Sequence, residues 1–419
     1  MYVQRELEHK LVKYMDRREV LAVVGPRQVG KTTLLKHMYG QLEVPDTDKE
    51  FITFENRSNR RLFQDIEDFK TRYRNYQYLF IDEFQYAREG GQKLKYLFDT
   101  TETKFIISGS SALDLTFKTQ KYLVGRMFLF NLWPFSFREY LQSASHDLKG
   151  AIEERIPDAL EGFDPQDVFG EELNRQLREH YHNFIVWGGY PAVVSAEDDP
   201  DVRRTILRAN FDAYLLKEIK DLLSLATDEE LTRLTVLLAS QVGGLINYNE
   251  LGNTSNLTFK STKNHLNILQ KTFLIDLVRP YFSNKRTEIV KNPKVYFIDT
   301  GFRNYRINDF RQLNVRNDAG ALVENSVYMA LRRRFAGEEN TSIKYWRTKN
   351  KAEVDFIIDL PDKIIPLEVK YSNNPTPGKS FYSFLRKYNP EKAFILTKGH
   401  TEFTEIEGTR VYFLPAFYL

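Results

Sequence analysis

The chain of 419 residues contains no cysteine and only seven histidines. Without thiols it can form neither disulfides nor thiolate metal sites, and with so few histidines we expect no structural zinc. His180 and His182 alternate as residues of a strand do, so they could share one face. Glu179 would then point to the opposite face, and no third ligand is apparent.

Long hydrophobic runs are also lacking. No apolar stretch approaches the ~20 residues of a transmembrane helix, and the segment Met1–Glu6 does not resemble a signal peptide. A large excess of charge is lacking too, because 60 Lys and Arg stand against 57 Asp and Glu. These absences predict a cytoplasmic protein with no membrane partner. An apolar content of 42% is sufficient for packed cores, and the length predicts about two to four domains.

The most informative motif is a phosphate-binding loop between an apolar run and a helical pattern. The run 20–24 predicts a buried strand, and backbone N–H groups after it would surround the phosphates of a nucleotide. Lys31 would reach the β- and γ-phosphates, and the Thr32 hydroxyl would bind Mg²⁺. An accidental glycine turn is the alternative, but the complete pattern favours ATP as cofactor. The residues assigned to ATP binding are Gly25, Pro26, Arg27, Gln28, Val29, Gly30, Lys31, Thr32, Thr33 and Ser108.

An acidic pair supplies the second half of the expected ATPase site. Asp82 and Glu83 follow the apolar run 78–81, about 50 residues after the loop. Asp82 would hold Mg²⁺ together with Thr32, and Glu83 would activate the attacking water as general base. Ser108 ends a third apolar run, where its hydroxyl either contacts the γ-phosphate or belongs to a serine-glycine turn.

Arg126 follows one short element later. It could act as an arginine finger on the γ-phosphate of a neighbouring subunit, which would make the protein a homo-oligomer. The alternative is an ordinary salt bridge within its own domain.

The alternation of strands and helices predicts the fold of the first part of the chain. Helical patterns separate most of the five expected strands, which is typical of a parallel, doubly wound α/β sheet. The extra strand between the acidic pair and Arg126 matches the ATPase branch that uses a catalytic glutamate. We expect an ATPase core over 1–141 and a lid-like helical region over 142–227. The expected strands are 20–24, 51–55, 78–82, 105–108 and 127–130.

Residues 228–305 have the pattern of a winged helix. Helices are expected at 231–240, from 247 and at 258–272, with a polar wing tip at 283–287. Eight basic residues stand against two acids between 256 and 295, an excess of six in a chain whose net charge is only +3. Concentrated positive charge favours DNA as partner, and a packing module with a solvated basic face is the alternative. The basic residues are Lys260, Lys263, Lys271, Arg279, Lys285, Arg286, Lys291 and Lys294.

The last part of the chain, 306–419, carries a second group of candidate residues. Glu324 is expected in the first turn of a helix at 322–333, and Asp355 in a strand at 352–359. Glu368 and Lys370 alternate in a strand at 363–370 and so share a face, which Asp355 joins if the two strands pair. Further expected elements are a strand at 343–347, a helix at 381–387 and a strand at 393–397.

These residue types are those that phosphodiester cleavage requires. The carboxylates of Glu324, Asp355 and Glu368 can hold Mg²⁺, and Lys370 can position or deprotonate the attacking water. The alternative is a surface hairpin with scattered charges. The order of the elements favours a nuclease-like fold, and whether the site cleaves DNA stays open.

The motifs together resemble a prokaryotic AAA-type ATPase family. The resemblance covers nearly the whole chain and implies an ATPase core, a winged helix and a C-terminal domain similar to PD-(D/E)xK restriction-endonuclease-like nucleases. One departure is that Glu353-Val-Asp355 has no proline before the aspartate, which leaves the fold expectation intact and the cleavage open. The motifs are FIDEFQ (80–85), SGSS (108–111), VGR (124–126), PFSFRE (134–139), GGYP (188–191), KNPKVYFIDTG (291–301) and EVDF (353–356).

We therefore expect a Mg²⁺-dependent ATPase that acts on DNA or is gated by it. The fold expected is an α/β P-loop sheet, then a winged helix and a small α/β nuclease-like domain. Two alternatives remain: a nucleotide-controlled DNA-binding switch with a silent nuclease-like domain, and a nucleotide-gated protein-interaction module without DNA. Salt-dependent binding of duplex DNA would separate the last from the others.

Overall fold

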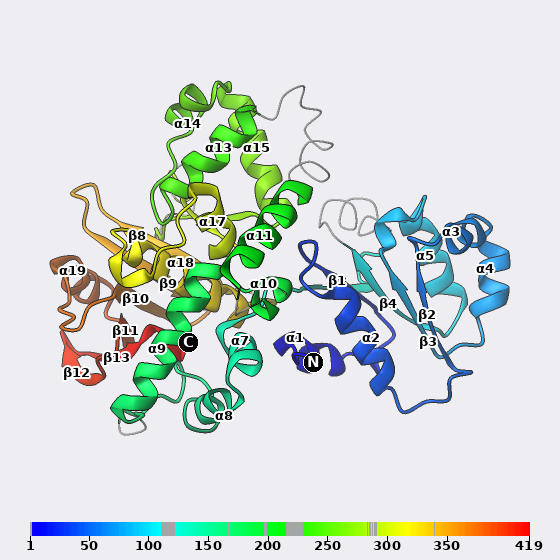
Figure 1. The fold of residues 1–419 in the computed structure, drawn as a ribbon, viewed down its shortest axis with the longest axis horizontal. Helices are drawn as coiled ribbons and strands as arrows, with labels where there is room; N and C mark the ends of the chain where they lie inside the picture. The colour runs from blue at the N-terminus through cyan, green and yellow to red at the C-terminus, as the bar shows by residue number, and fades with distance from the viewer. Residues whose placement is uncertain are drawn as a thin grey trace. The chain divides into compact units, whose positions relative to one another are not determined.

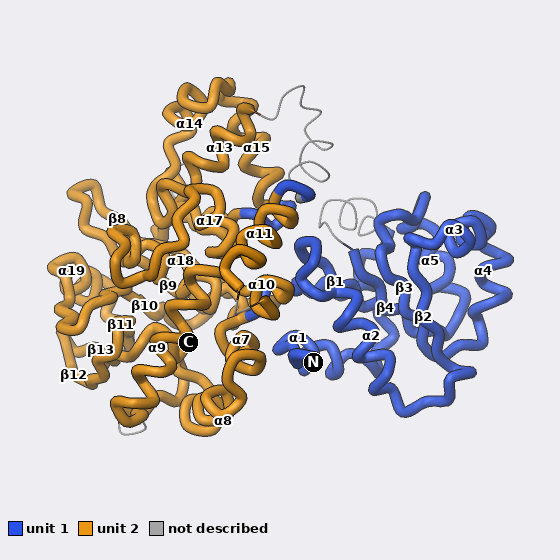
Figure 2. The backbone as a smooth tube through the Cα atoms, in the orientation of Figure 1, with its two compact units in different colours: residues 1–135, 212–223, 271–274 blue, residues 136–211, 224–270, 275–419 orange. Residues whose placement is uncertain are grey.

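The computed structural model describes residues 2–109, 122–165, 168–196, 199–214, 229–282, 284, 286, 288, 291–338 and 340–419. Contacts within the chain divide it into two compact units, coloured separately in Figure 2. Unit 1 comprises 1–135, 212–223 and 271–274, and unit 2 comprises 136–211, 224–270 and 275–419.

Unit 1 is a parallel α/β sheet with helical connections (Figure 1). Its sheet order is β2-β3-β4-β1-β5, and every neighbouring pair is parallel. The elements are α1 (Glu6–Val12), β1 (Val20–Val24), α2 (Lys31–Gln41), β2 (Lys49–Thr53), α3 (Arg57–Gln64), α4 (Ile66–Tyr73), β3 (Tyr78–Asp82), the 3-10 helix η1 (Phe84–Tyr86), α5 (Gly90–Thr100), β4 (Lys104–Gly109) and β5 (Met127–Asn131).

This sheet confirms the parallel α/β fold expected for the first part of the chain. All five expected strands are present, each within two residues of its expected bounds. Strand β4 lies between β3 and β1 in the sheet. The central strands are apolar because both faces are covered: every residue of β1 and β3 is buried, and α2 packs against β2, β3 and β4.

Unit 2 contains a helical part, a two-stranded sheet and a six-stranded sheet. Three helices, α13 to α15, precede the antiparallel pair β6–β7, in the order that a winged helix requires. Of the expected wing tip, Ser283, Lys285 and Thr287 lie outside the described residues. The elements of the helical part are α7 (Phe137–Ala144), α8 (His146–Arg155), α9 (Glu171–Trp187), α10 (Pro191–Ser195), α11 (Pro200–Tyr214), α13 (Glu229–Ser240), α14 (Tyr248–Ser255), α15 (Phe259–Lys271), β6 (Ile275–Val278), β7 (Lys294–Phe297), α17 (Thr300–Ile307) and η4 (Leu313–Val315).

The C-terminal part of unit 2 is built on a mixed sheet of order β12-β13-β11-β10-β9-β8. Strand β10 pairs with β9 antiparallel and with β11 parallel, so the expected hairpin of 352–359 with 363–370 is present. The aromatic side chains Trp346, Phe381 and Phe384 belong to the buried core between α19 and the sheet. Strands β12 and β13 were not expected from the sequence. The elements are α18 (Ala319–Arg334), β8 (Ser342–Arg347), β9 (Glu353–Asp359), β10 (Ile364–Lys370), α19 (Lys379–Tyr388), β11 (Lys392–Thr397), β12 (Glu402–Ile406), β13 (Thr409–Pro415) and η5 (Ala416–Tyr418).

Two local expectations are wrong. His180 and His182 lie in helix α9 and not in a strand; they contact Tyr140 and Tyr371 respectively. Glu324 lies in the second turn of α18, because that helix begins at Ala319, three residues before the expected start. Among the helices that the structure describes, none combines the length and the apolar character that crossing a membrane requires.

Two sequence motifs of unit 2 fit against each other. The buried Asp299 carboxylate, before α17, accepts hydrogen bonds from the N–H groups of Gly189 (2.8 Å) and Phe302 (3.1 Å). Gly301 lies so close to the C-terminal end of α9 that a Cβ atom there would be 2.1 Å from the carbonyl oxygen of Trp187. The GGYP and DTG segments, about 110 residues apart, therefore pack directly against each other, with little room for larger side chains at the contact.

Gly301→Ala is expected to destabilise unit 2 by about 1–3 kcal/mol, because the new methyl group must displace backbone rather than a flexible side chain. The matched control is Gly320→Ala in α18, where a Cβ atom would meet nothing within 4 Å. That change should be neutral or stabilise by about 0.5–1 kcal/mol, since alanine favours the helix. Urea unfolding of both variants measures the difference, and equal stabilities would contradict the packing argument.

Candidate nucleotide-binding site

The candidate site lies at the carboxyl end of β1, where the chain turns through residues 25–30 into α2. Gln28 and Gly30 have φ angles of 60° and 94°, so the loop passes twice through the left-handed region. At Gly25 the chain passes next to the end of β5, and a Cβ atom would lie 2.1 Å from the carbonyl oxygen of Leu132. Helix α2 begins at Lys31, which places the N–H groups of its first turn at the loop.

Lys31 is held inside this loop. Its side chain is buried, with 5% exposed, and Nζ donates to the carbonyl oxygens of Gly25 (2.9 Å) and Pro26 (2.7 Å). A buried ammonium is costly to desolvate, and here backbone oxygens of the loop compensate it. The same position would let Lys31 meet the phosphates that the loop cradles.

Thr32 and Asp82, which are expected to hold Mg²⁺ at this site, lie together, and Ser108 from a third element joins them. The Thr32 hydroxyl of α2 donates to Oδ2 of Asp82 over 2.7 Å, and the Ser108 hydroxyl of β4 donates to the other carboxylate oxygen. Oxygen ligands of this kind suit a hard divalent cation, so the residues present fit Mg²⁺. The structure thus brings Thr32 and Asp82 into direct contact, and their binding of Mg²⁺ stays a prediction.

Glu83 follows β3 and has left-handed backbone angles (φ 56°, ψ 44°). Its N–H donates to Ser108 Oγ over 3.1 Å, and its carboxylate accepts a hydrogen bond from the Gln85 side chain. Burial raises the pKa of Glu83, and the nearby Lys31 ammonium partly opposes that rise. A half-buried carboxylate with a raised pKa is a better proton acceptor, which suits a general base.

Arg126 lies away from this site within unit 1. It precedes β5, whose first residue Met127 pairs with Val20, so it lies at the edge where strands begin, opposite the phosphate loop. Its Nε forms an ion pair with Asp99 over 3.0 Å. The salt bridge weighed in the sequence is therefore present, and action as a finger on another subunit stays a prediction.

A second cluster of charges lies in unit 2 around Lys294, the first residue of β7. The Lys294 ammonium is 2% exposed and lies 2.6 Å from Glu353 Oε1, 3.1 Å from Glu324 Oε1 and 3.8 Å from Asp355 Oδ1. Burial alone lowers the pKa of Lys294, but these three carboxylates raise it above its usual value. Burial and the neighbouring Asp355 raise the pKa of Glu324, whose Oε1 also accepts from Tyr296 (2.6 Å).

Glu368 and Lys370 lie beside this cluster on β10. Lys370 Nζ is 2.6 Å from Glu368 Oε1, and the Val369 N–H donates to Asp355 Oδ2 over 2.8 Å. Burial raises the pKa of Glu368 to about 7. The structure thus brings the expected Glu324, Asp355, Glu368 and Lys370 into one region. Among the described residues, however, no group of three acidic or histidine side chains is arranged to hold a metal ion.

Three contacts at these sites were missed in the sequence. Arg5 donates to the carbonyl oxygens of Val29 (2.8 Å) and Trp133 (2.6 Å), so it fastens the phosphate loop to the chain after β5. Gln85 holds the Glu83 carboxylate, and Lys294 lies among the acids of unit 2. Gln85 could have been suspected from its place two residues after Glu83, whereas Arg5 and Lys294 carry no local signal.

Comparison with known proteins agrees with this geometry in unit 1. Residues 17–141 match the family of the AAA domain. This segment is an AAA-type P-loop domain. Residues 178–313 and 319–417 match two families described only as domains of unknown function (DUF8612 and DUF4143). The winged helix and the nuclease-like fold therefore remain proposals.

Relatives of the whole chain have no described activity. An uncharacterized protein of Haemophilus influenzae is 25% identical over 97% of this chain and 95% of its own length. An uncharacterized protein of Methanocaldococcus jannaschii is also 25% identical, over 86% of this chain and 77% of its own. Solved structures similar to the chain include the Aeropyrum pernix ORC1 protein in complex with DNA (TM-score 0.32, 11% identity, 74% of this chain and 93% of that one). A TM-score this low carries no conclusion about what the chain binds.

Proposed function

We propose that the protein is a Mg²⁺-dependent ATPase whose ATP cycle acts on DNA or is gated by it. The observation that carries the ATPase assignment is the set of contacts at the AAA domain: Lys31 in the phosphate loop, Thr32 bonded to Asp82, and Glu83 beside Ser108. Bound Mg²⁺ would neutralise phosphate charge during hydrolysis. Lys31 would bind the phosphates, and Glu83 would orient the water and accept its proton.

The DNA assignment is supported by the exposed basic residues of α15 and of the chain around β6 and β7. Lys260 and Lys263 are exposed on α15, next to the half-exposed ring of Phe259, and Arg286 and Lys291 are exposed after β6. The two acids of this stretch are engaged elsewhere: Asp276 bonds with Arg332, and Glu288 with Lys344. Lys294 is buried and cannot join this basic surface, so the expected charge excess is reduced by one.

Lys260→Glu/Lys263→Glu is expected to weaken binding of duplex DNA for all sequences alike and to lower the slope of log K against log salt by about 2, since each phosphate contact contributes about 0.9. The matched control is Arg72→Glu/Arg74→Glu, which makes the same charge change at exposed positions of unit 1 near α4. The decisive measurement of the function is the ATPase rate with and without duplex DNA. A rate unaffected by DNA, with equal affinity in all variants, would leave α15 as a packing helix.

For the C-terminal domain we favour a scaffold over a nuclease. Lys294 places an ammonium among Glu324, Glu353 and Asp355, where cleavage would need a divalent cation. The alternative is that Asp355 and Glu368 bind Mg²⁺ with Glu324, and Lys370 activates water. The salt bridge of Lys370 to Glu368 is compatible with both roles.

A further inference from the structure

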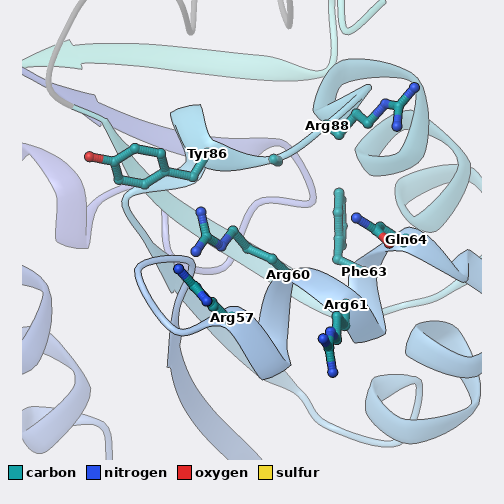
Figure 3. Close-up of a pocket in the computed structure, with 8 residues that line it drawn as sticks. Arg57, Arg60, Arg61, Phe63, Gln64, Tyr86 and Arg88 are labelled. Atoms are coloured by element: carbon teal, nitrogen blue, oxygen red, sulfur yellow. The ribbon is translucent and has the colours of Figure 1, made fainter.

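Unit 1 has a pocket that the ATPase site does not use. It is a cavity of about 290 Å³ between α3 and the segment of η1 that follows Glu83. The charged and aromatic side chains that line it are drawn in Figure 3: Arg57, Arg60, Arg61, Arg88, Tyr86 and Phe63. A cavity of this size is comparable to small-ligand sites, and four of its lining residues are cations.

These arginines lack the carboxylate partners that several exposed arginines have elsewhere in the described part of the chain. The exposed Arg175, Arg204 and Arg233 each form an ion pair with an acid three or four residues away on their own helix. Helix α3 has the sequence RSNRRLFQ and no acid, and among the described residues none forms an ion pair with the four arginines of the pocket. Its positive charge is therefore uncompensated within the part of the chain that the structure describes.

Arg57 and Arg60 are three residues apart and thus on one face of α3. In Figure 3 their guanidinium groups lie next to each other on the side of Tyr86, and the Arg60 guanidinium is 5.8 Å from the centre of that ring. Adjacent like charges on a helix repel each other, and a bound anion would turn this repulsion into attraction to the ligand. Guanidinium groups donate paired hydrogen bonds that match phosphate oxygens.

Tyr86 distinguishes between possible anions. Its ring is 43% exposed, although an aromatic ring of this size usually gains by burial. Aromatic rings beside arginines form the stacking surface on which unpaired bases lie, and a duplex keeps its bases covered. A single strand of nucleic acid supplies both the phosphates for the arginines and a base for Tyr86. An acidic peptide would supply only the charge.

The pocket is joined to the hydrolysis site through packed residues. Phe63 of α3 and Phe84 of η1 contact each other, with ring centres 5.9 Å apart, and both contact Phe54. Gln85, between Phe84 and Tyr86, holds the carboxylate of Glu83. Movement of Tyr86 on binding would therefore act on the segment that positions the general base.

We propose that Arg57, Arg60 and Tyr86 form a binding site for the backbone and one base of single-stranded nucleic acid. Occupation of this site stimulates ATP hydrolysis through Gln85 and Glu83. This proposal rests on the proposed function and extends it. It adds a nucleic-acid contact on the AAA domain itself, apart from the one proposed on α15.

The test measures binding of a fluorescent oligothymidylate by anisotropy, with the whole chain and with ATP absent. Arg57→Glu/Arg60→Glu should weaken binding about ten-fold or more. It should also lower the slope of log K against log salt by about 1.4, because two phosphate contacts to a single strand are lost and each contributes about 0.7. Tyr86→Ala should weaken binding, because the ring on which a base stacks is lost. Tyr86→Phe keeps an aromatic ring and should bind as the wild type does. The control Arg72→Glu/Arg74→Glu makes the same charge change outside the pocket and should bind as wild type does.

ATPase assays complete the test. Oligothymidylate should stimulate hydrolysis in the wild type and in the control but not in Arg57→Glu/Arg60→Glu, whose basal rate should equal that of the wild type. Equal oligonucleotide affinity in the pocket and control variants overturns the proposal. So does binding of polyglutamate that is tighter than binding of the oligonucleotide and that is lost in Arg57→Glu/Arg60→Glu. If the chain hydrolysed no ATP at all, the proposed function would fail, whereas the anisotropy result would still decide whether the pocket binds a single strand.

Discussion

Glu83→Gln is expected to lower the rate of ATP hydrolysis by about 10²–10⁴-fold while ATP remains bound. Glutamine keeps the size of the side chain but cannot accept the proton of the attacking water. The Glu83 N–H contact with Ser108 belongs to the backbone and should survive, so Asp82, Thr32 and the loop keep their places. Phosphate release measures hydrolysis, and calorimetric titration with ATP measures binding. Wild-type hydrolysis in this variant would refute the role assigned to Glu83.

Lys31→Ala should instead abolish ATP binding, because the loop loses the charge that neutralises the phosphates. The matched control is Lys36→Ala, on the same helix but exposed to solvent. It should bind and hydrolyse ATP as the wild type does. The two variants together separate loss of a specific contact from loss of positive charge on α2, and similar behaviour of both would contradict the loop assignment.

The AAA domain could be predicted from the sequence because its signals are local. The strand 20–24, the glycines of the loop and Lys31 are contiguous, and Asp82 directly follows a buried strand. Parallel strands must end at the same edge, so the loop and the acidic pair come together whatever the details of the helices. The sequence could not tell whether Ser108 joins the site, because its bond to Asp82 depends on how β4 aligns with β3.

The region around Lys294 could not be predicted in the same way. In the sequence, Lys294 is one of eight basic residues between 256 and 295, and this pattern predicts that it belongs to a DNA-binding surface. Its carboxylate partners come from α18 and β9, 30 and 59–61 positions later, so only the packing of β7 against them reveals the buried ammonium. Strand β12 was missed for a simpler reason: the alternation in Glu402–Ile406 is mostly polar because that edge strand is largely exposed.

Lys294→Met is expected to destabilise the protein by about 3–5 kcal/mol, because it removes the cation from a buried ion cluster and leaves the acids facing each other. Methionine has a similar length and no charge, so the loss of stability measures the removal of the charge more than a change in packing volume. Lys363→Met, in the exposed turn before β10, is the control and should change the free energy of unfolding by less than about 0.5 kcal/mol. Urea unfolding measures both.

The same variant decides between the scaffold and the nuclease. With Lys31→Ala present to remove metal binding at the ATP site, Mn²⁺ should raise the unfolding midpoint of Lys294→Met but not that of the chain with Lys294, because the freed carboxylates then have room for a divalent cation. Adding Asp355→Ala/Glu368→Ala should abolish that stabilisation. If instead the chain with Lys294 bound Mn²⁺ and nicked DNA, and lost both with Asp355→Ala/Glu368→Ala, Lys294 would be a neighbour of a working metal site and the domain a nuclease. The ammonium at 2.6 Å from Glu353 and 3.1 Å from Glu324 is the reason to expect the first result.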